Sequence, residues 1–204
     1  MTNTPTSDAG SAVQDQTSAT RDYKGIQIPV PGDYVLDTAH TTIEFVARHL
    51  MISKVRGRFT RFEGAVNIAE DPEKSSLDIS VDTDSIDTSE PNRDAHLRSG
   101  DFLEADKYPK MTFKSTKVEH RGDMSWRVTG DLTIHDVTKP LQLDVEFLGG
   151  SVSPWGSRPF GFEATSELDR EEWGLTWNQA LETGGVVVGR KVRIEINAEL
   201  LPRQ

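Results

Sequence analysis

From residue 33 onward, apolar and polar residues alternate with a period of two along most of the chain. The clearest runs cover residues 43–49, 55–59, 62–68, 77–81, 126–134, 141–147, 160–168 and 192–200. This alternation is typical of strands with one dry face and one wet face, which usually pair antiparallel. The pattern predicts about eight to ten strands, separated by turns rich in Gly, Asp, Pro and Ser.

So many strands have to close on themselves or stack in two layers. The connections between them are short, which favours antiparallel neighbours. Closing an eight-stranded sheet leaves an interior that side chains fill or that holds one small ligand. A chain of 204 residues suits one such domain. We therefore predict an all-β fold, an extended antiparallel barrel of about eight strands.

One long segment interrupts the strand pattern. Residues 93–104 mix charged groups with Leu97 and Phe102, and a spacing of three places Arg93 and His96 near one another on a helix. We predict a short helix over this segment that caps one end of the barrel, with Leu97 and Phe102 facing the interior.

The beginning of the chain lacks the apolar period and is rich in Thr, Ser, Asp and Gly. Such a segment buries too little apolar surface to offset the entropy of ordering it. We predict that residues 1–31 form a disordered polar tail and that residues 32–204 form the barrel domain.

The charge of the chain restricts its partners. The net charge is -10, with the acidic residues scattered along the sequence, so we expect neither nucleic acid nor an anionic membrane as a partner, since binding to either needs a basic face. The local exception is residues 48–61, which hold five basic residues and no acidic one. These cations are either solvated charges on strand faces or contacts for the anionic head of a ligand.

Cysteine is absent, which excludes disulfides, zinc–thiolate sites and thiol catalysis. We expect no metal and no cofactor. No stretch approaches the roughly 18 apolar residues of a membrane span, and the N-terminus shows no basic region followed by an apolar one. We therefore expect no integral membrane segment and a cytoplasmic location, and the sequence leaves a homodimer open.

Familiar catalytic motifs are missing: the sequence has no Gly-x-Ser-x-Gly elbow, no His-Glu-x-x-His helix and no phosphate-binding Gly-rich loop. We expect no catalytic residue, because an enzyme would depend on histidines that only the fold could bring together. His49 shares the parity of Ile43 and Phe45 and is expected to point inward. It is either a core histidine bonded to the backbone or a polar anchor at the mouth of a cavity.

Aromatic and small residues share the inward parity of several strands. They either form an ordinary core or line a cavity, and a cavity of this kind would suit a long apolar ligand. Our candidates for contact with the tail of such a ligand are Ile43, Phe45, Phe59, Ile79, Phe102, Phe113, Leu132 and Trp177. Our candidates for contact with its polar head are His49, Arg93, His96 and Arg58, although the parity of Arg58 points outward.

Several short motifs, in their order and spacing, resemble the YceI-like family of lipocalin-fold polyisoprenoid-binding proteins. The motifs are Tyr34-Val35-Leu36-Asp37, Gly57-Arg58-Phe59, Arg93-Asp94-Ala95-His96-Leu97, Tyr108-Pro109-Lys110-Met111-Thr112-Phe113 and Gly130-Asp131-Leu132-Thr133-Ile134. The resemblance covers nearly all of residues 32–200. It implies a lipocalin-like barrel with a hydrophobic pore that takes a polyisoprenoid or a similar amphiphile lengthwise.

Together, the residues and the resemblance favour a non-enzymatic binding protein that stores or transports a long-chain isoprenoid lipid or isoprenoid quinone in its barrel. Two alternatives stay open. One is an enzyme that acts on a small hydrophobic substrate through a histidine and carboxylate site at the barrel mouth. The other is a stress-related interaction protein whose barrel is a filled core.

Overall fold

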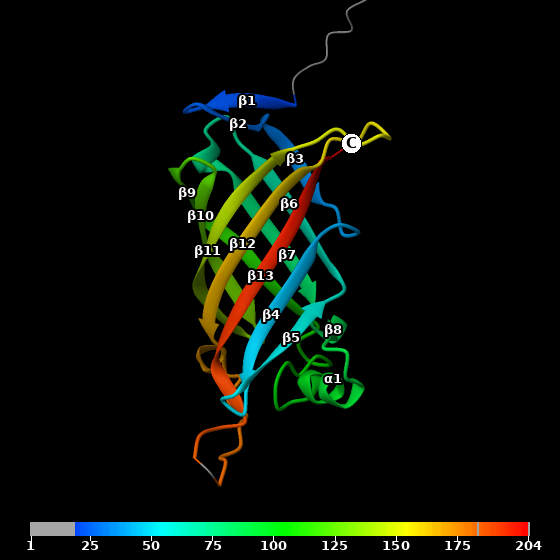
Figure 1. Ribbon diagram of the computed structural model, residues 1–204, viewed down its shortest axis with the longest axis vertical. Helices are drawn as coiled ribbons and strands as arrows, with labels where there is room; N and C mark the ends of the chain where they lie inside the picture. Colours follow the sequence, from blue (N-terminus) through cyan, green and yellow to red (C-terminus); the bar gives the residue numbers. More distant parts are fainter. Residues whose placement is uncertain (1–18, 183, 204) are drawn as a thin grey trace, which may run out of the picture.

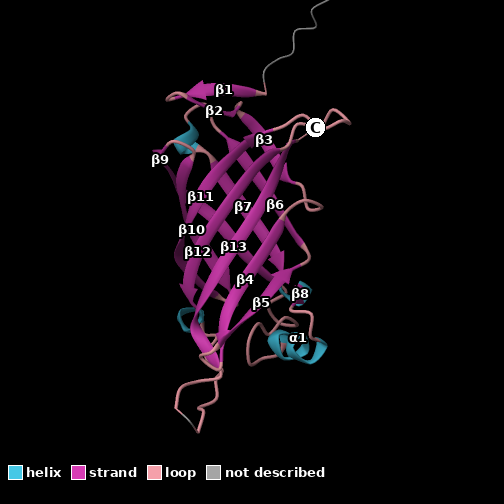
Figure 2. Cartoon of the chain, in the orientation of Figure 1, coloured by secondary structure: helices cyan, strands magenta, loops and turns pink. Residues whose placement is uncertain are grey.

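The computed structural model describes residues 19–182 and 184–203, which form a tall barrel of strands with a short helix at one end (Figure 1, Figure 2). The strands are β1 (Thr20–Tyr23), β2 (Ile26–Pro29), β3 (Gly32–Leu36), β4 (Thr42–His49), β5 (Ser53–Phe59), β6 (Phe62–Ile68), β7 (Ser76–Asp82), β8 (Ile86–Asp87), β9 (Lys110–Gly122), β10 (Ser125–Ile134), β11 (Val137–Gly150), β12 (Phe160–Asp169) and β13 (Val188–Pro202). The helical segments are α1 (Pro91–Arg98) and the 3-10 turns η1 (Pro72–Lys74), η2 (Thr83–Ser85) and η3 (Arg170–Trp173). The predicted all-β class is confirmed.

Pairing between strands closes the main sheet. Its eleven strands follow the order β12-β11-β10-β9-β7-β6-β3-β13-β4-β5-β8, and β12 also pairs with β13. Strand β13 pairs antiparallel with both β4 and β3, so these two are successive parts of one wall. Strands β5 and β6 are likewise successive parts of a second wall, and strands β7 and β8 are successive parts of a third. The result is a closed antiparallel barrel of eight walls, as predicted, and three of these walls consist of two successive strands.

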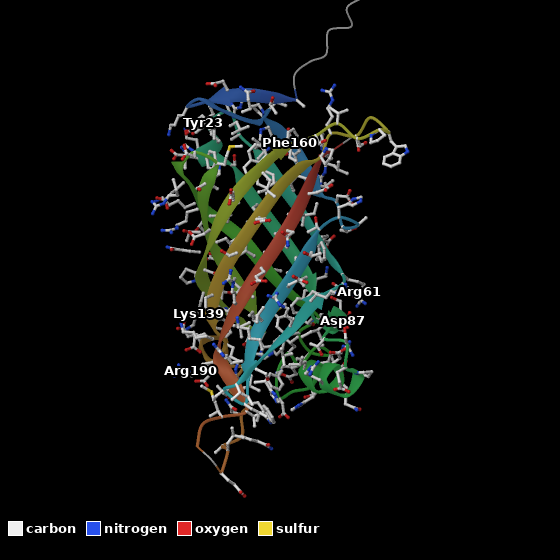
Figure 3. All side chains as sticks on the ribbon, viewed as in Figure 1. Tyr23, Arg61, Asp87, Lys139, Phe160 and Arg190 are labelled. Carbon is white, nitrogen blue, oxygen red and sulfur yellow. The ribbon has the colours of Figure 1, made fainter. Side chains whose placement is uncertain are left out.

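The alternation of side chains decides what the barrel encloses. Along β11, Leu143 and Phe147 are buried, whereas Asp144 and Glu146 are exposed. This is the two-residue period of a strand with one inner and one outer face. Clusters of buried apolar side chains follow the inner face of the walls from one end of the barrel to the other. Figure 3 places Tyr23 and Phe160 at the upper end and Arg190 near the lower end.

Strands β1 and β2 form a hairpin that lies across the upper end of the barrel in Figure 1. Ile28 is only 3 % exposed and belongs to a buried cluster under the hairpin. Tyr23 stacks on Trp126 with 5.8 Å between ring centroids. Arg21 donates hydrogen bonds to the backbone carbonyls of residues 69 and 70. These contacts tie the hairpin to the barrel rim.

The prediction of a disordered tail is therefore wrong for residues 19–31. Residues 1–18 lie outside the described part of the chain. The three apolar residues of the hairpin, Tyr23, Ile26 and Ile28, are too few to show a period. They find their apolar partners on strands distant in sequence, which a local pattern does not reveal.

Helix α1 spans Pro91–Arg98, so the prediction of a helix over residues 93–104 is wrong at both ends. Proline suits the first position of the helix, because a backbone N–H group there would have no acceptor within the helix. The Glu90 carboxylate caps the helix by accepting hydrogen bonds from two backbone N–H groups. Residues 99–107 are mostly turns, and they bring Phe102 into a buried position.

Gly130 on β10 sits where a side chain has no room. A Cβ atom there would lie 2.6 Å from the backbone oxygen of Lys114 and would also collide with the ring of Phe113. The ring can rotate away, but the β9 backbone cannot move without breaking its ladder. We expect Gly130→Ala to lower the free energy of unfolding by about 2–3 kcal/mol, measured by urea denaturation. Gly161→Ala is the control, because its Cβ would meet no atom closer than 3.4 Å; equal losses for the two variants would contradict this account.

Candidate functional site

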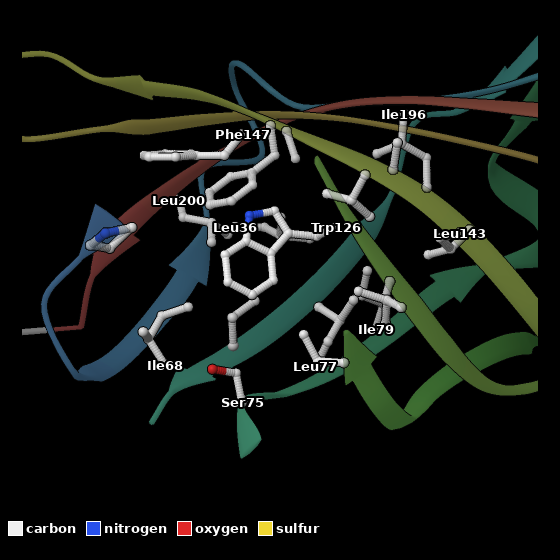
Figure 4. A pocket seen from close by; sticks show the side chains of 18 of the residues that line it. Leu36, Ile68, Ser75, Leu77, Ile79, Trp126, Leu143, Phe147, Ile196 and Leu200 are labelled. Carbon is white, nitrogen blue, oxygen red and sulfur yellow. The ribbon is translucent and has the colours of Figure 1, made fainter. Parts of the chain in front are cut away.

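Two apolar cavities occupy the interior of the described barrel. The upper cavity lies below the β1–β2 hairpin and has a volume of about 160 Å³. Figure 4 shows Trp126 projecting into it among Leu36, Leu77 and Phe147. The lower cavity has a volume of about 210 Å³, and Phe102 contributes to its wall beside α1. Both linings are almost wholly apolar.

Four side chains border both cavities: Ile43, Ile79, Leu143 and Ile196. They project from β4, β7, β11 and β13. The two cavities therefore meet at this ring of side chains, which we call the waist. A slender apolar chain that passed the waist would occupy both cavities along the barrel.

Seven of the eight tail candidates lie in the wall of the lower cavity: Ile43, Phe45, Phe59, Ile79, Phe102, Phe113 and Leu132. Trp177 lies outside both linings. It packs edge-on against His96, with 4.6 Å between ring centroids, and against Phe102 at 5.2 Å. Strand parity was sufficient to place most of these side chains inward, and their contact with a lipid stays a prediction.

None of the four head-group candidates lines either cavity. Arg58 points outward, as its parity indicates, and forms an ion pair with Asp87 at 3.0 Å. Arg93 donates hydrogen bonds to the hydroxyl and the carbonyl oxygen of Thr88 at 2.7 Å and 2.8 Å. Both guanidinium groups are thus engaged in holding β8 and the start of α1 in place.

The two histidine candidates lie near the lower cavity without lining it. The His96 Nε2 atom lies 2.8 Å from Asp101 Oδ2, and the imidazole meets the ring of Phe102 edge-on at 5.1 Å. His49 is half-buried at the end of β4, two residues beyond Ala47, which borders the lower cavity. The inward anchor expected of His49 is not part of the lining, and head-group contact by either histidine stays a prediction.

Arg170 is the charged side chain that borders the lower cavity in the described part of the chain. It is 4 % exposed and donates hydrogen bonds to the backbone carbonyls of Leu175, Val188 and Gly189. It forms no ion pair with a described residue, and burial lowers the pKa of its guanidinium. Since an arginine stays protonated at neutral pH, the wall of an apolar cavity carries one positive charge without a carboxylate partner.

Sequence reasoning missed Arg170 and the upper cavity. The signal that the sequence offered for Arg170 was its position between a strand and the Trp173-Gly174 pair. Gly174 adopts a φ of 82° and ends the η3 turn. For the upper cavity, parity places Trp126 and Phe147 inward. Parity does not show where packing leaves an empty space. In addition, Ile28, which lines the upper cavity, lies in the segment that was predicted to be a disordered tail.

A polar group outside the cavities consists of Asp37, His40 and Glu199. The His40 Nδ1 atom lies 2.9 Å from Asp37 Oδ2 and 3.9 Å from Glu199 Oε2. One ligand atom of each residue lies within 4.8 Å of the others, a spacing that a metal ion could use. Their mutual contacts already account for the positions of these exposed or half-buried side chains, so we assign no metal site to them.

This group predicts a small pH dependence of stability. The hydrogen bond with Asp37 raises the pKa of His40. The resulting stabilisation is complete below about pH 6.5, the ordinary histidine value, and is lost as the pH rises through the folded-state pKa. We expect the urea midpoint to fall slightly between about pH 5.5 and about pH 8.5, and the Asp37→Asn variant to lose that fall. An NMR titration that gave His40 an ordinary or lower pKa would contradict this.

The closed antiparallel barrel with an apolar interior defines a protein of the lipocalin-like class. The chain belongs to the YceI family, because the model of the YceI-like domain matches residues 34–200. The family resemblance seen in the sequence is thereby confirmed. The β1–β2 hairpin precedes the matched region. Within the described residues, no helix has the length and apolar character needed to cross a membrane.

Relatives and solved structures agree with this assignment. A UPF0312 protein of Vibrio parahaemolyticus is 44% identical over 146 residues, which cover 70% of this chain and 77% of the relative. The crystal structure of the Campylobacter jejuni YCEI protein aligns with a TM-score of 0.66 at 28% identity, over 77% of this chain and 90% of that one. A polyisoprenoid binding domain from Saccharophagus degradans aligns with a TM-score of 0.57 over 83% of this chain and 98% of that one; at 15% identity it shows the fold alone.

Proposed function

We propose that the protein binds one long-chain isoprenoid lipid or isoprenoid quinone inside the barrel and stores or transports it without enzymatic activity. The observation that carries this proposal is the pair of apolar cavities that meet at the waist. Burying about 300 Å² of a tail there would contribute about 7 kcal/mol at about 25 cal/mol per Å², which offsets the entropy lost on binding. The similar fold of the polyisoprenoid binding domain from Saccharophagus degradans supports the same ligand class.

Arg170 favours one orientation of the ligand. The upper end of the barrel is covered by the hairpin, whereas the wall of the lower cavity carries the positive charge of Arg170. A phosphate or a quinone oxygen gains more beside a cation than in the apolar upper cavity. In our proposal the head therefore lies at the lower end, near Arg170 and the His96 imidazole, and the tail extends upward through the waist.

Tryptophan fluorescence provides a test. Trp177 packs against His96 and Phe102 at the lower end, whereas Trp155 is 90% exposed. Titration with a long-chain ubiquinone in detergent should quench the fluorescence to a plateau at one ligand per chain. Trp177→Phe should remove much of this quenching, because the proposal places the quinone ring beside it, and Trp155→Phe should leave it intact.

Two outcomes would contradict the proposal. Protein that carries no lipid in native mass spectrometry, and whose fluorescence stays unchanged on quinone titration, would show a filled core and would overturn the proposal. Quenching that depends on Trp155 in place of Trp177 would place the quinone on the outer surface.

A further inference from the structure

The turn between β4 and β5 exposes two apolar side chains at the lower end of the barrel. Met51 is 54% exposed and Ile52 is 81% exposed. Leu50 and Met51 have φ angles of 51° and 62°. A residue with a side chain adopts this left-handed conformation at a cost of about 1–2 kcal/mol, and Gly or Asn usually occupies such a position. The turn thus has a conformational cost and exposes two apolar side chains to water.

Two unpaired cations flank this turn. Arg48 and Lys54 are exposed and lie directly opposite each other in the β4–β5 ladder, an arrangement of like charges that destabilises a sheet. Neither forms an ion pair with a residue that the structure describes. By contrast, Arg56 on the same strand pairs with Glu195 at 2.6 Å. The turn therefore presents positive charge in a chain whose net charge is -10.

The turn also stands at the edge of the lower cavity. Ala47 and Val188 border that cavity. His49 pairs with Val188 in the ladder, and the Leu50 N–H donates a hydrogen bond to the carbonyl of Val187 at 2.8 Å. In Figure 1 this end of β4 and β5 lies far from the β1–β2 hairpin, beside the loop that precedes β13. The exposed side chains are thus only a few residues from the cavity wall.

We propose that residues 48–54, the basic apolar tip, dock on an anionic lipid surface. Met51 and Ile52 would enter the apolar boundary of the bilayer, and Arg48 and Lys54 would contact lipid phosphates, the pairing that binds amphipathic segments to membranes. Because the rest of the chain is acidic, an anionic surface would orient the tip toward it. The inference rests on the proposed function, since a barrel that carries a membrane lipid has to collect it at a bilayer.

Co-sedimentation with vesicles tests the inference. Full-length protein is mixed with vesicles of phosphatidylcholine alone or of phosphatidylcholine with phosphatidylglycerol, without added isoprenoid. We expect binding to the mixed vesicles that weakens as salt rises. Ile52→Ser should lower the affinity about tenfold, and Arg48→Gln about fivefold. Trp155→Ser, which removes an exposed apolar side chain outside the tip, is the matched control and should leave the affinity unchanged.

Each other result has a definite meaning. Absence of binding by the wild type, or equal effects of the tip and Trp155 variants, would overturn the inference. A dimer in sedimentation velocity that the tip variants abolish, without vesicle binding, would assign the tip to a second copy of the chain. Quinone uptake from detergent is measured in parallel. If the protein takes up no quinone but still binds vesicles, the proposed function is wrong and the docking inference stands. If tip variants lose vesicle binding but still take up quinone, the result supports both the proposed function and the docking inference.

Discussion

Replacing Ile79 with tryptophan should separate long-tailed from short-tailed ligands. Ile79 borders both cavities at the waist, so an indole there fills the passage between them. A tail stopped at the waist would lose about 110 Å² of buried apolar surface, which lowers its affinity about a hundredfold at about 25 cal/mol per Å². Farnesol, whose isoprenoid chain is much shorter, should bind with nearly unchanged affinity. Calorimetric titration of farnesol and of a long-chain ubiquinone measures the difference.

The matched control is Ile79→Leu, which keeps the side-chain volume and should bind both ligands as the wild type does. The larger indole overpacks the core at a cost of about 1–3 kcal/mol, so urea denaturation of each variant comes first. Equal losses for farnesol and the quinone would mean that the variant had damaged the whole interior. Unchanged quinone affinity would mean that the tail does not pass the waist.

Replacing Arg170 with methionine should produce a large loss of stability. The variant removes the Arg170 donor from the carbonyls of Leu175 and Gly189, whereas the Val188 carbonyl keeps its hydrogen bond from the Asn178 side-chain amide at 2.7 Å. A buried polar group without a partner costs about 1–3 kcal/mol, so we expect the free energy of unfolding to fall by about 3–5 kcal/mol. Methionine keeps the apolar stem of the side chain, and the loss therefore reports the hydrogen bonds. Urea denaturation followed by circular dichroism measures it.

Arg190 supplies the control for this experiment. It lies on the surface near the lower end (Figure 3) and pairs with Asp169 at 2.7 Å and Glu171 at 3.0 Å. Water screens such exposed pairs, so Arg190→Met should cost much less than Arg170→Met. If the two variants lost the same stability, the buried hydrogen bonds of Arg170 would not be what holds the segment before β13 to the barrel.

The barrel itself could be predicted because its signal is local. Along β11, every second side chain faces the interior, and this period is visible in the sequence. The same parity placed Phe45, Phe59 and Phe113 at the wall of the lower cavity. Eight walls were expected, although the joints within three of them were not, since a bend between β3 and β4 depends on pairing with the distant β13.

The polar part of the site could not be predicted in the same way. Arg93 was a head-group candidate, but two of its guanidinium nitrogens donate hydrogen bonds to Thr88. His49 has the inward parity, yet it sits at the end of β4, beyond the reach of the cavity lining. Arg170 follows a strand like many surface arginines, and only the fold of the segment before β13 buries it. Long-range contacts decide each of these cases, and the sequence carries no local signal for them.

The β1–β2 hairpin lies across the upper end of the barrel. Its strands, at residues 20–23 and 26–29, precede the region matched by the family model, which begins at residue 34. In the orientation that we propose, a tail that extends upward from the lower end would meet Ile28 and Pro29, which border the upper cavity. A longer tail would have to leave its surplus outside the mouth. In our proposal, the ten residues of the hairpin, which lie outside the family domain, therefore limit the length of tail that the barrel can fully cover.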